Sequence, residues 1–206
     1  MGDSLTGYIE SAEELRRYFA APGERAVRKQ LARLDVHCRR FIELSPFVVV
    51  ASGNGGQLDA SPRGGAPGFV KVVDDVTLWI PDAPGNNRLD SLVNILASGR
   101  AGVLFLIPGV DETLRVNGAA RVSVDPAKLA QFASETRTPR VVLEITVEEA
   151  FLHCAKALMR SKLWSAEARQ DRAVLPTLGQ MLADQIGTSA PVETQEQMVE
   201  RYKRDL

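Results

Sequence analysis

The sequence predicts a mostly β protein, an antiparallel sheet with flanking helices, and three observations support this. Short apolar stretches follow one another through turns of hairpin length, with one helix inserted among them. Segment 113–124 alternates apolar and polar residues strictly, as a strand with one buried face does. Helical crossovers, which a parallel sheet needs, do not separate the strands. We therefore expect six or seven strands that curl into a barrel.

Composition limits the function classes. The 206 residues are 45% hydrophobic and 25% charged, with a formal net charge of -1. This balance argues against a nucleic-acid or membrane partner, because such binders carry an excess of Lys and Arg. No apolar stretch approaches the roughly 20 residues of a membrane span. The acidic N-terminus lacks the plan of a signal peptide, and the two cysteines give no disulfide framework, so we expect a cytoplasmic protein.

We expect a single domain over residues 1–206. It comprises N-terminal helices over 1–45, a barrel core over 46–149 and a C-terminal helical segment over 150–206. Ser11 and Glu14 form a capping box that opens a helix through about Ala20. A second helix is predicted over 24–44, because its apolar residues recur in steps of four and three. These are Val27, Leu31, Leu34, Cys38 and Phe41.

Two hairpins follow. "FVVVAS" and "QLDAS" flank "GNGG", in which Asn54-Gly55 is a strong turn signal. "GFVKVV" and "VTLWIP" flank Asp74-Asp75 in the same way. The tight turns predict antiparallel pairing within each hairpin.

A helix is predicted next, with Gly99 as its stop. Its predicted apolar face consists of Leu89, Leu92, Val93 and Leu96. "AGVLFLI" is typical of a strand buried on both faces, and Pro108-Gly109 turns it. In segment 113–124 one predicted face carries Leu114, Val116, Ala120, Val122 and Val124. "RVVLEITVEE" is a further strand, and the tail from Ala150 is predicted helical with breaks at Pro176 and Pro191.

The stretch "PDAPGNNRLDSL", residues 81–92, is the first candidate binding site. The start of a helix presents unpaired N–H groups to an anion, Asn86 and Asn87 add amide donors, and Arg88 suits phosphate oxygens. Helix capping by an asparagine explains the same residues equally well.

"SPRGG", residues 61–65, is the second candidate, because Arg63 stands among residues that allow a ligand close to the backbone. A wide loop with an exposed arginine is the alternative.

Two further polar sets stand out. Thr113, Arg115 and Asn117 form the outward row of one strand, which has a functional role only where a ligand or second subunit covers it. On a helix, His153, Lys156 and Arg160 would share one cationic face, with Trp164 a turn further on. A solvated helix face is the commoner explanation of such a stripe.

Metal and nucleotide motifs are disfavoured. His37-Cys38 and His153-Cys154 are pairs of adjacent residues whose side chains point apart, and their spacing is not that of a zinc site. "GNGG" lacks the Lys-Ser/Thr of a P-loop, and neither a dinucleotide-binding glycine motif nor a nucleophile elbow occurs. We therefore expect no metal site.

Several fragments, in this order, resemble a known family. They are "SPRGGAPGFV", "LWIPDAPGNNRLDSLVNIL", "GVLFLIPGVDETLRVNGAARV" and "FLHCAKALMRSKLW". Together they look like the FMN-binding split-barrel family related to pyridoxamine 5'-phosphate oxidase, over roughly residues 40–166. Within it they resemble a subgroup of uncharacterised flavin-nucleotide-binding oxidoreductases. The resemblance implies a six-stranded split β-barrel and a homodimer, with FMN in two clefts at the interface.

The resemblance also implies roles for particular residues. Ser61 and Arg63 would sit beside the phosphate or ring edge of FMN, and Asn86, Asn87 and Arg88 would grip the phosphate, with Ser91 one turn into the helix. Ile80 and Pro81 would offer backbone contacts to the isoalloxazine edge. Thr113 and Arg115 would reach FMN across the dimer, and Lys156, Arg160 and Trp164 would close the cleft.

The resulting expectation is an FMN-dependent oxidoreductase that uses a small organic substrate or a nicotinamide electron donor. The cofactor would carry the redox chemistry. No catalytic acid or base is assigned, although Lys156 and Arg160 would stabilise negative charge on reduced flavin or substrate. Vitamin B6 oxidation is disfavoured, because the chain lacks the C-terminal arginine and tryptophan pattern of that enzyme. The alternatives are a non-catalytic flavin carrier, or a haem- or deazaflavin-binding member of the fold; haem ligation would fall to His37, His153 or the cysteines.

Overall fold

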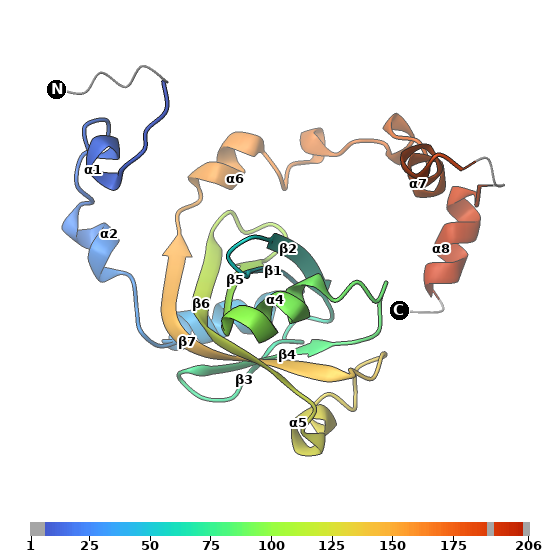
Figure 1. The fold of residues 1–206 in the computed structure, drawn as a ribbon, viewed down its shortest axis with the longest axis horizontal. Helices are drawn as coiled ribbons and strands as arrows, with labels where there is room; N and C mark the ends of the chain where they lie inside the picture. The colour runs from blue at the N-terminus through green and yellow to red at the C-terminus, as the bar shows by residue number, and fades with distance from the viewer. Residues whose placement is uncertain (1–6, 189–191, 204–206) are drawn as a thin grey trace.

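The protein is built on one antiparallel sheet flanked by helices (Figure 1). The computed structural model describes residues 7–188 and 192–203. Seven strands follow one another across the sheet in the order β2-β1-β5-β6-β7-β4-β3. This is one strand more than the six implied by the family resemblance, because the two-residue strand β3, Lys71–Val72, adds to the edge at β4.

Both predicted hairpins are confirmed. β1 (Phe47–Gly53) pairs with β2 (Leu58–Gly64), and β3 pairs with β4 (Thr77–Asp82). Strand β2 runs through most of "SPRGG", so the wide loop considered for that stretch is wrong. Its Pro62 is compatible with the strand because β2 is an edge strand, whose outward-facing N–H groups have no strand to bond with.

The three long strands follow as β5 (Arg100–Leu106), β6 (Thr113–Ser123) and β7 (Val141–His153). The alternation predicted for β6 is confirmed at Leu114, Val116 and Ala120, which are buried. Val124 lies outside the strand and is 68% exposed, so its predicted place on that face is wrong. The prediction that β5 is buried on both faces is also wrong, since every second residue of that strand is only half-buried.

The long helix predicted over 24–44 is wrong. That segment forms two separate helices, α2 (Glu24–Arg28) and α3 (Val36–Leu44), while the capping box at Ser11 opens a shorter helix than predicted, α1 (Ala12–Leu15). Leu31 leaves the helical path to bond with Ala150 of β7, donating at 3.0 Å and accepting at 2.8 Å. Asp35 then starts a new helix by accepting from the Cys38 N–H at 2.8 Å. Pairing with the sheet outweighs the helical pattern here.

Helix α4 (Asp90–Ser98) ends at Gly99 as predicted, in the left-handed conformation with φ 67°. It packs against β1, β2 and β6. Its predicted apolar face is wrong, however: the buried side chains are Ser91, Leu92, Asn94 and Ile95. Of the predicted set, only Leu92 is buried, and Leu96 is 72% exposed. The buried side of α4 combines apolar Leu92 and Ile95 with Ser91 and Asn94, and Asn94 donates to Ser52 of β1, at 3.4 Å.

The C-terminal part begins later than predicted, because β7 continues to His153. Short helices follow along an arm that extends away from the sheet (Figure 1). They are α6 (Lys156–Ser161), η1 (Ala166–Ala168), η2 (Arg172–Val174), α7 (Leu178–Ile186) and α8 (Gln195–Lys203). Helix α5 (Pro126–Ala130) lies between β6 and β7. Pro176 precedes α7, whereas the break predicted at Pro191 lies outside the described residues. None of the helices in the described parts is long and apolar enough to cross a membrane.

The sheet curls so that its two ends approach each other. Arg63 on the edge strand β2 pairs with Asp82 on β4, near the opposite edge. No backbone pairing closes the sheet among the described strands. The core fills the inner face with fully buried side chains such as Val48, Phe105, Leu114 and Ile145.

Candidate functional site

A cavity of about 570 Å³, here called the first cavity, opens where α4 begins. The ends of β2 and β4, the loop between β4 and α4 and the start of β7 enclose it. Its walls include six of the predicted site residues: Ser61, Arg63, Asn86, Asn87, Arg88 and Ser91. These residues come from two stretches more than 20 positions apart in the sequence, and the fold brings them together.

The loop into α4 has an unusual backbone. Asn87 and Leu89 have φ of 59° and 61°, in the left-handed region that residues other than glycine rarely adopt. Asn86 accepts from the Arg88 N–H at 3.1 Å and so fixes the turn. Leu89 is the N-cap residue, and no side chain caps the helix, so the capping explanation for the asparagines is wrong. Strain of this kind costs about 1 kcal/mol or more per residue and is often found at ligand sites.

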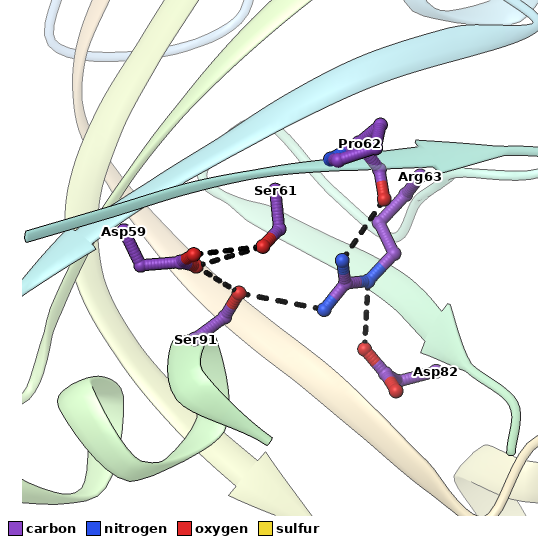
Figure 2. Close-up of polar contacts among 6 residues, drawn as sticks. All are labelled: Asp59, Ser61, Pro62, Arg63, Asp82 and Ser91. Atoms are coloured by element: carbon purple, nitrogen blue, oxygen red, sulfur yellow. Dashed lines mark hydrogen bonds and ion pairs between the residues drawn. The ribbon is translucent and has the colours of Figure 1, made fainter. Parts of the chain in front are cut away.

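Arg63 is fixed between the two ends of the sheet. Its Nε donates to Asp82 Oδ2 at 2.8 Å and its Nη1 donates to the Pro62 carbonyl at 2.9 Å, as Figure 2 shows. The two charged side chains are 23% and 13% exposed, so water screens this pair only in part. The guanidinium is therefore held in one orientation at the wall of the cavity.

Asp59 of β2 holds the two serines of the site. Ser61 donates to its carboxylate at 2.8 Å, and Ser91 donates at 2.5 Å, joining β2 to α4 (Figure 2). The hydroxyl protons are thus directed at Asp59 and not into the cavity. In this arrangement Ser61 and Ser91 position the walls, while the donors available to an anion are the guanidinium and backbone N–H groups.

The charges around the first cavity suit an anionic ligand. Arg63, Arg88 and Arg140 line it, against the two carboxylates of Asp82 and Asp90. Arg88 is exposed and pairs with Asp90 at 2.8 Å, which raises its pKa and keeps it charged. Arg140 is exposed and has no carboxylate within ion-pair distance in residues 7–188 and 192–203. Together with the uncapped start of α4, these arginines offer the donors that phosphate oxygens need.

Ile80 and Pro81 lie on β4 but take different positions. The side chain of Ile80 is fully buried in the core. Pro81 lines a second cavity of about 620 Å³, which shares Pro62, Arg63, Ala83 and Pro84 with the first. The Arg63–Asp82 pair thus lies where the two cavities meet.

Thr113 and Arg115 are not part of either cavity. The sheet register places Arg115 in one row with Leu104, Val49 and Pro62, whereas Arg63 shares the core row with Val48 and Phe105. Rows of opposite parity face opposite sides of a sheet. Arg115 pairs instead with Glu149 at 2.5 Å, and its Nε is buried without a hydrogen-bond partner. Within one chain, the two sets of predicted residues do not meet.

Lys156, Arg160 and Trp164 also lie away from the first cavity. His153 is the last residue of β7, so the predicted helix face shared by His153, Lys156 and Arg160 is wrong. Arg160 Nε donates to the Lys156 carbonyl at 3.1 Å, and Trp164 Nε1 donates to the Val110 carbonyl at 2.9 Å. The indole therefore holds the C-terminal helical arm against the loop before β6.

Three residues of the site escaped sequence-based prediction: Asp59, Asp82 and Arg140. Asp59 lies two residues before Ser61, and period-2 alternation places them on one strand face. Asp82 stands inside the stretch chosen as the first candidate, but its partner Arg63 is on a strand that does not pair with β4. Nothing in the local sequence marks Arg140, which directly precedes β7 and reaches the cavity only in the folded chain.

A family model described as pyridoxamine 5'-phosphate oxidase matches residues 34–154. No match was found among curated proteins. Among solved structures, the chain is similar to HupZ of Group A Streptococcus, with 18% identity and a TM-score of 0.49 over 58% of this chain and 93% of that one. It is also similar to an FMN-binding protein from Syntrophomonas wolfei, at 11% identity and a TM-score of 0.42 over 56% of this chain and 83% of that one. A third similar structure is an FAD-binding protein from Mycobacterium smegmatis, at 15% identity and a TM-score of 0.41 over 59% of this chain and 98% of that one.

Proposed function

The chain belongs to the pyridoxamine 5'-phosphate oxidase family, and from this premise we propose that it is an FMN-binding oxidoreductase of the split-barrel type. The observation that carries the proposal is the first cavity, where three arginines and an uncapped helix start face one space. A phosphate monoester is the group that such a donor set suits best.

The donor set also decides which residues would hold the cofactor. Arg140 and the exposed Arg88, which pairs with Asp90 through Nε, would turn toward a phosphate, while Arg63 is fixed by Asp82 and contributes its charge at the junction of the two cavities. Asp59 supports this wall through Ser61 and Ser91. Asn86 keeps the loop in the shape that leaves the first N–H groups of α4 open.

Bound FMN would supply the redox chemistry, by accepting and releasing a hydride or single electrons. The chain's own residues bind and orient. We assign no catalytic residue to the lining of the first cavity. The physiological reductant is proposed to be a nicotinamide or a small organic substrate.

We further propose that the protein acts as a homodimer. Thr113 and Arg115 lie on the opposite side of the sheet from Arg63, so one chain cannot bring them to its own first cavity. A second copy, placed against that outer face, would supply them to the ligand of the first.

The visible spectrum of the purified full chain tests the proposed activity. After loading with FMN and removal of the excess, we expect a flavin band that NADH or NADPH bleaches under anaerobic conditions. A flavin band that no reductant changes would support the non-catalytic carrier. A haem Soret band in the protein as isolated, or the absence of any retained flavin, would contradict the proposal.

A further inference from the structure

A third cavity, here called the arm cavity, lies between the N-terminal arm and the end of β7. Its volume is about 810 Å³. It shares no lining residue with the two cavities beside Arg63. Residues 23–31, here called the N-terminal arm, lie outside the part of the chain that the family model matches. The cavity is therefore built with a segment that the matched region does not include.

The arm is fixed to the sheet and does not merely lie near it. Leu31 exchanges two backbone hydrogen bonds with Ala150, at 3.0 and 2.8 Å. Lys29 Nζ donates to the Leu152 carbonyl at 2.8 Å and lies 4.1 Å from the ring centroid of Phe151 (Figure 1 shows the arm beside β7). These contacts hold the walls of the cavity at a defined separation.

Cations outnumber carboxylates at the arm cavity. Arg25 and Lys29 line it, and neither has a carboxylate within ion-pair distance among the described residues. Asp35 is the acidic residue of the lining, and its carboxylate is already engaged in capping α3. The pKa of the neighbouring His153 is lowered by burial and by the charges of Arg115 and Lys29, so this histidine is neutral at pH 7 and needs no anionic partner.

The floor of the arm cavity is apolar. Its apolar lining residues are Leu31, Cys38, Ala150 and Leu152, together with Gly23 and Ala26 of the arm. Ligand sites commonly combine an apolar lining with a few placed charges, and their volumes are about 300–1,000 Å³. An apolar floor below two cations without acidic partners suits a molecule that has an apolar body and one anionic end.

We propose that the arm cavity binds a small organic acid, with its anionic group at Lys29 and Arg25 and its apolar body on Leu31 and Leu152. A carboxylate or a phosphate would satisfy the two cations equally. The proposal does not rest on flavin binding, because no residue of the first cavity takes part.

Cys154 provides a built-in reporter, since it lines the arm cavity and is exposed. The backbone N–H of Lys156 lowers the pKa of its thiol, with help from the charges of Lys156 and Lys29. Burial raises the pKa of Cys38, the second thiol of the chain, to about 11. Iodoacetamide, which is uncharged, should therefore alkylate Cys154 selectively, and mass spectrometry follows the rate.

The experiment measures this rate in the full chain with octanoate, octyl phosphate or 1-octanol added. We expect octanoate or octyl phosphate to slow alkylation in a saturable way, and 1-octanol to require at least a tenfold higher concentration. Whichever acid protects at the lower concentration identifies the preferred head group. Absence of protection by both acids, or equal protection by 1-octanol, would overturn the proposal.

Variants in α2 and at its C-cap residue Lys29 give a matched control. Arg25→Met should weaken protection about threefold or more, and Lys29→Met about tenfold. Arg28→Met removes a cation that pairs with Glu24 in solvent, at 3.1 Å, and should leave protection unchanged. Equal effects of Arg25→Met and Arg28→Met would contradict binding in this cavity. Arg88→Ala changes a residue of the first cavity alone, so the acids should protect Cys154 in this variant as in the unaltered protein. The proposal for the arm cavity can therefore fail while the proposed flavin site holds, and the reverse.

Discussion

Arg63 and Asp82 are the two residues that join the ends of the sheet at the first cavity. Arg63 and Arg88 stand out in the sequence because arginine among glycine, proline or asparagine suits a phosphate. Asp82 was not recognised as the partner of Arg63, although the two lie 2.8 Å apart in the folded chain. Their strands are not neighbours in the sheet, and period-2 patterning predicts only which side of a strand a residue faces. The curl of the whole sheet creates the pair.

Glu144 on β7 illustrates a residue-scale prediction about pH. Its carboxylate accepts from Lys128 and, at 2.8 Å, from the indole of Trp79, and the Lys128 hydrogen bond is the main cause of its lowered pKa. A lowered pKa in the folded state adds stability that is present above pH 4.5 and is lost as the pH falls further. We expect Glu144→Gln to lower the free energy of unfolding by about 1 kcal/mol at pH 7.

Urea unfolding at pH 7 and at pH 3.5 checks this. The difference between Glu144→Gln and the unaltered protein should shrink at the lower pH. Glu148→Gln, which removes an exposed partner of Arg100, serves as the control and should have little effect at either pH. A difference for Glu144→Gln that stays constant with pH would contradict the linkage.

At the scale of elements, turns were easier to predict than helices. Asn54-Gly55 and Asp74-Asp75 specify hairpins through local geometry alone. The apolar pattern over 24–44 is real, yet Leu31 bonds with β7 and Asp35 caps a separate helix, so tertiary contacts divide it. The pattern of α4 was misleading for a related reason: Ser91 and Asn94 find hydrogen-bond partners in the sheet, so these two polar residues are buried beside Leu92 and Ile95.

Strand β6 supports a prediction about one glycine. At Gly118 the register with β7 shifts, and a Cβ there would lie 1.9 Å from the backbone oxygen of Thr146. A backbone atom cannot move aside as a flexible side chain can, so we expect Gly118→Ala to cost about 2 kcal/mol or more. Gly56→Ala, in the open turn between β1 and β2, should have a far smaller effect. Thermal unfolding compares the two variants, and similar midpoints would show that the close approach at Gly118 is not constraining.

At the scale of the whole molecule, the proposed dimer follows from the two faces of the sheet. The fold class and the first cavity could be anticipated from one chain, but the places of Thr113, Arg115 and the residues after His153 could not. Their roles depend on what covers the outer face, which no pattern within the chain encodes. We expect sedimentation equilibrium to give twice the chain mass of 22.4 kDa. A monomer at micromolar concentration would contradict the shared site.

The affinity of the full chain for FMN, measured by calorimetry in Arg88→Ala, tests the central claim most directly. Arg88 is exposed and pairs only with Asp90 among described carboxylates, so its removal should leave the unfolding temperature unchanged. Arg100→Ala, beyond the other end of α4, is the matched control. If the first cavity holds the phosphate, Arg88→Ala should bind FMN at least about tenfold more weakly, and Arg100→Ala should bind it like the unaltered protein. Equal affinity in all three proteins would contradict the account.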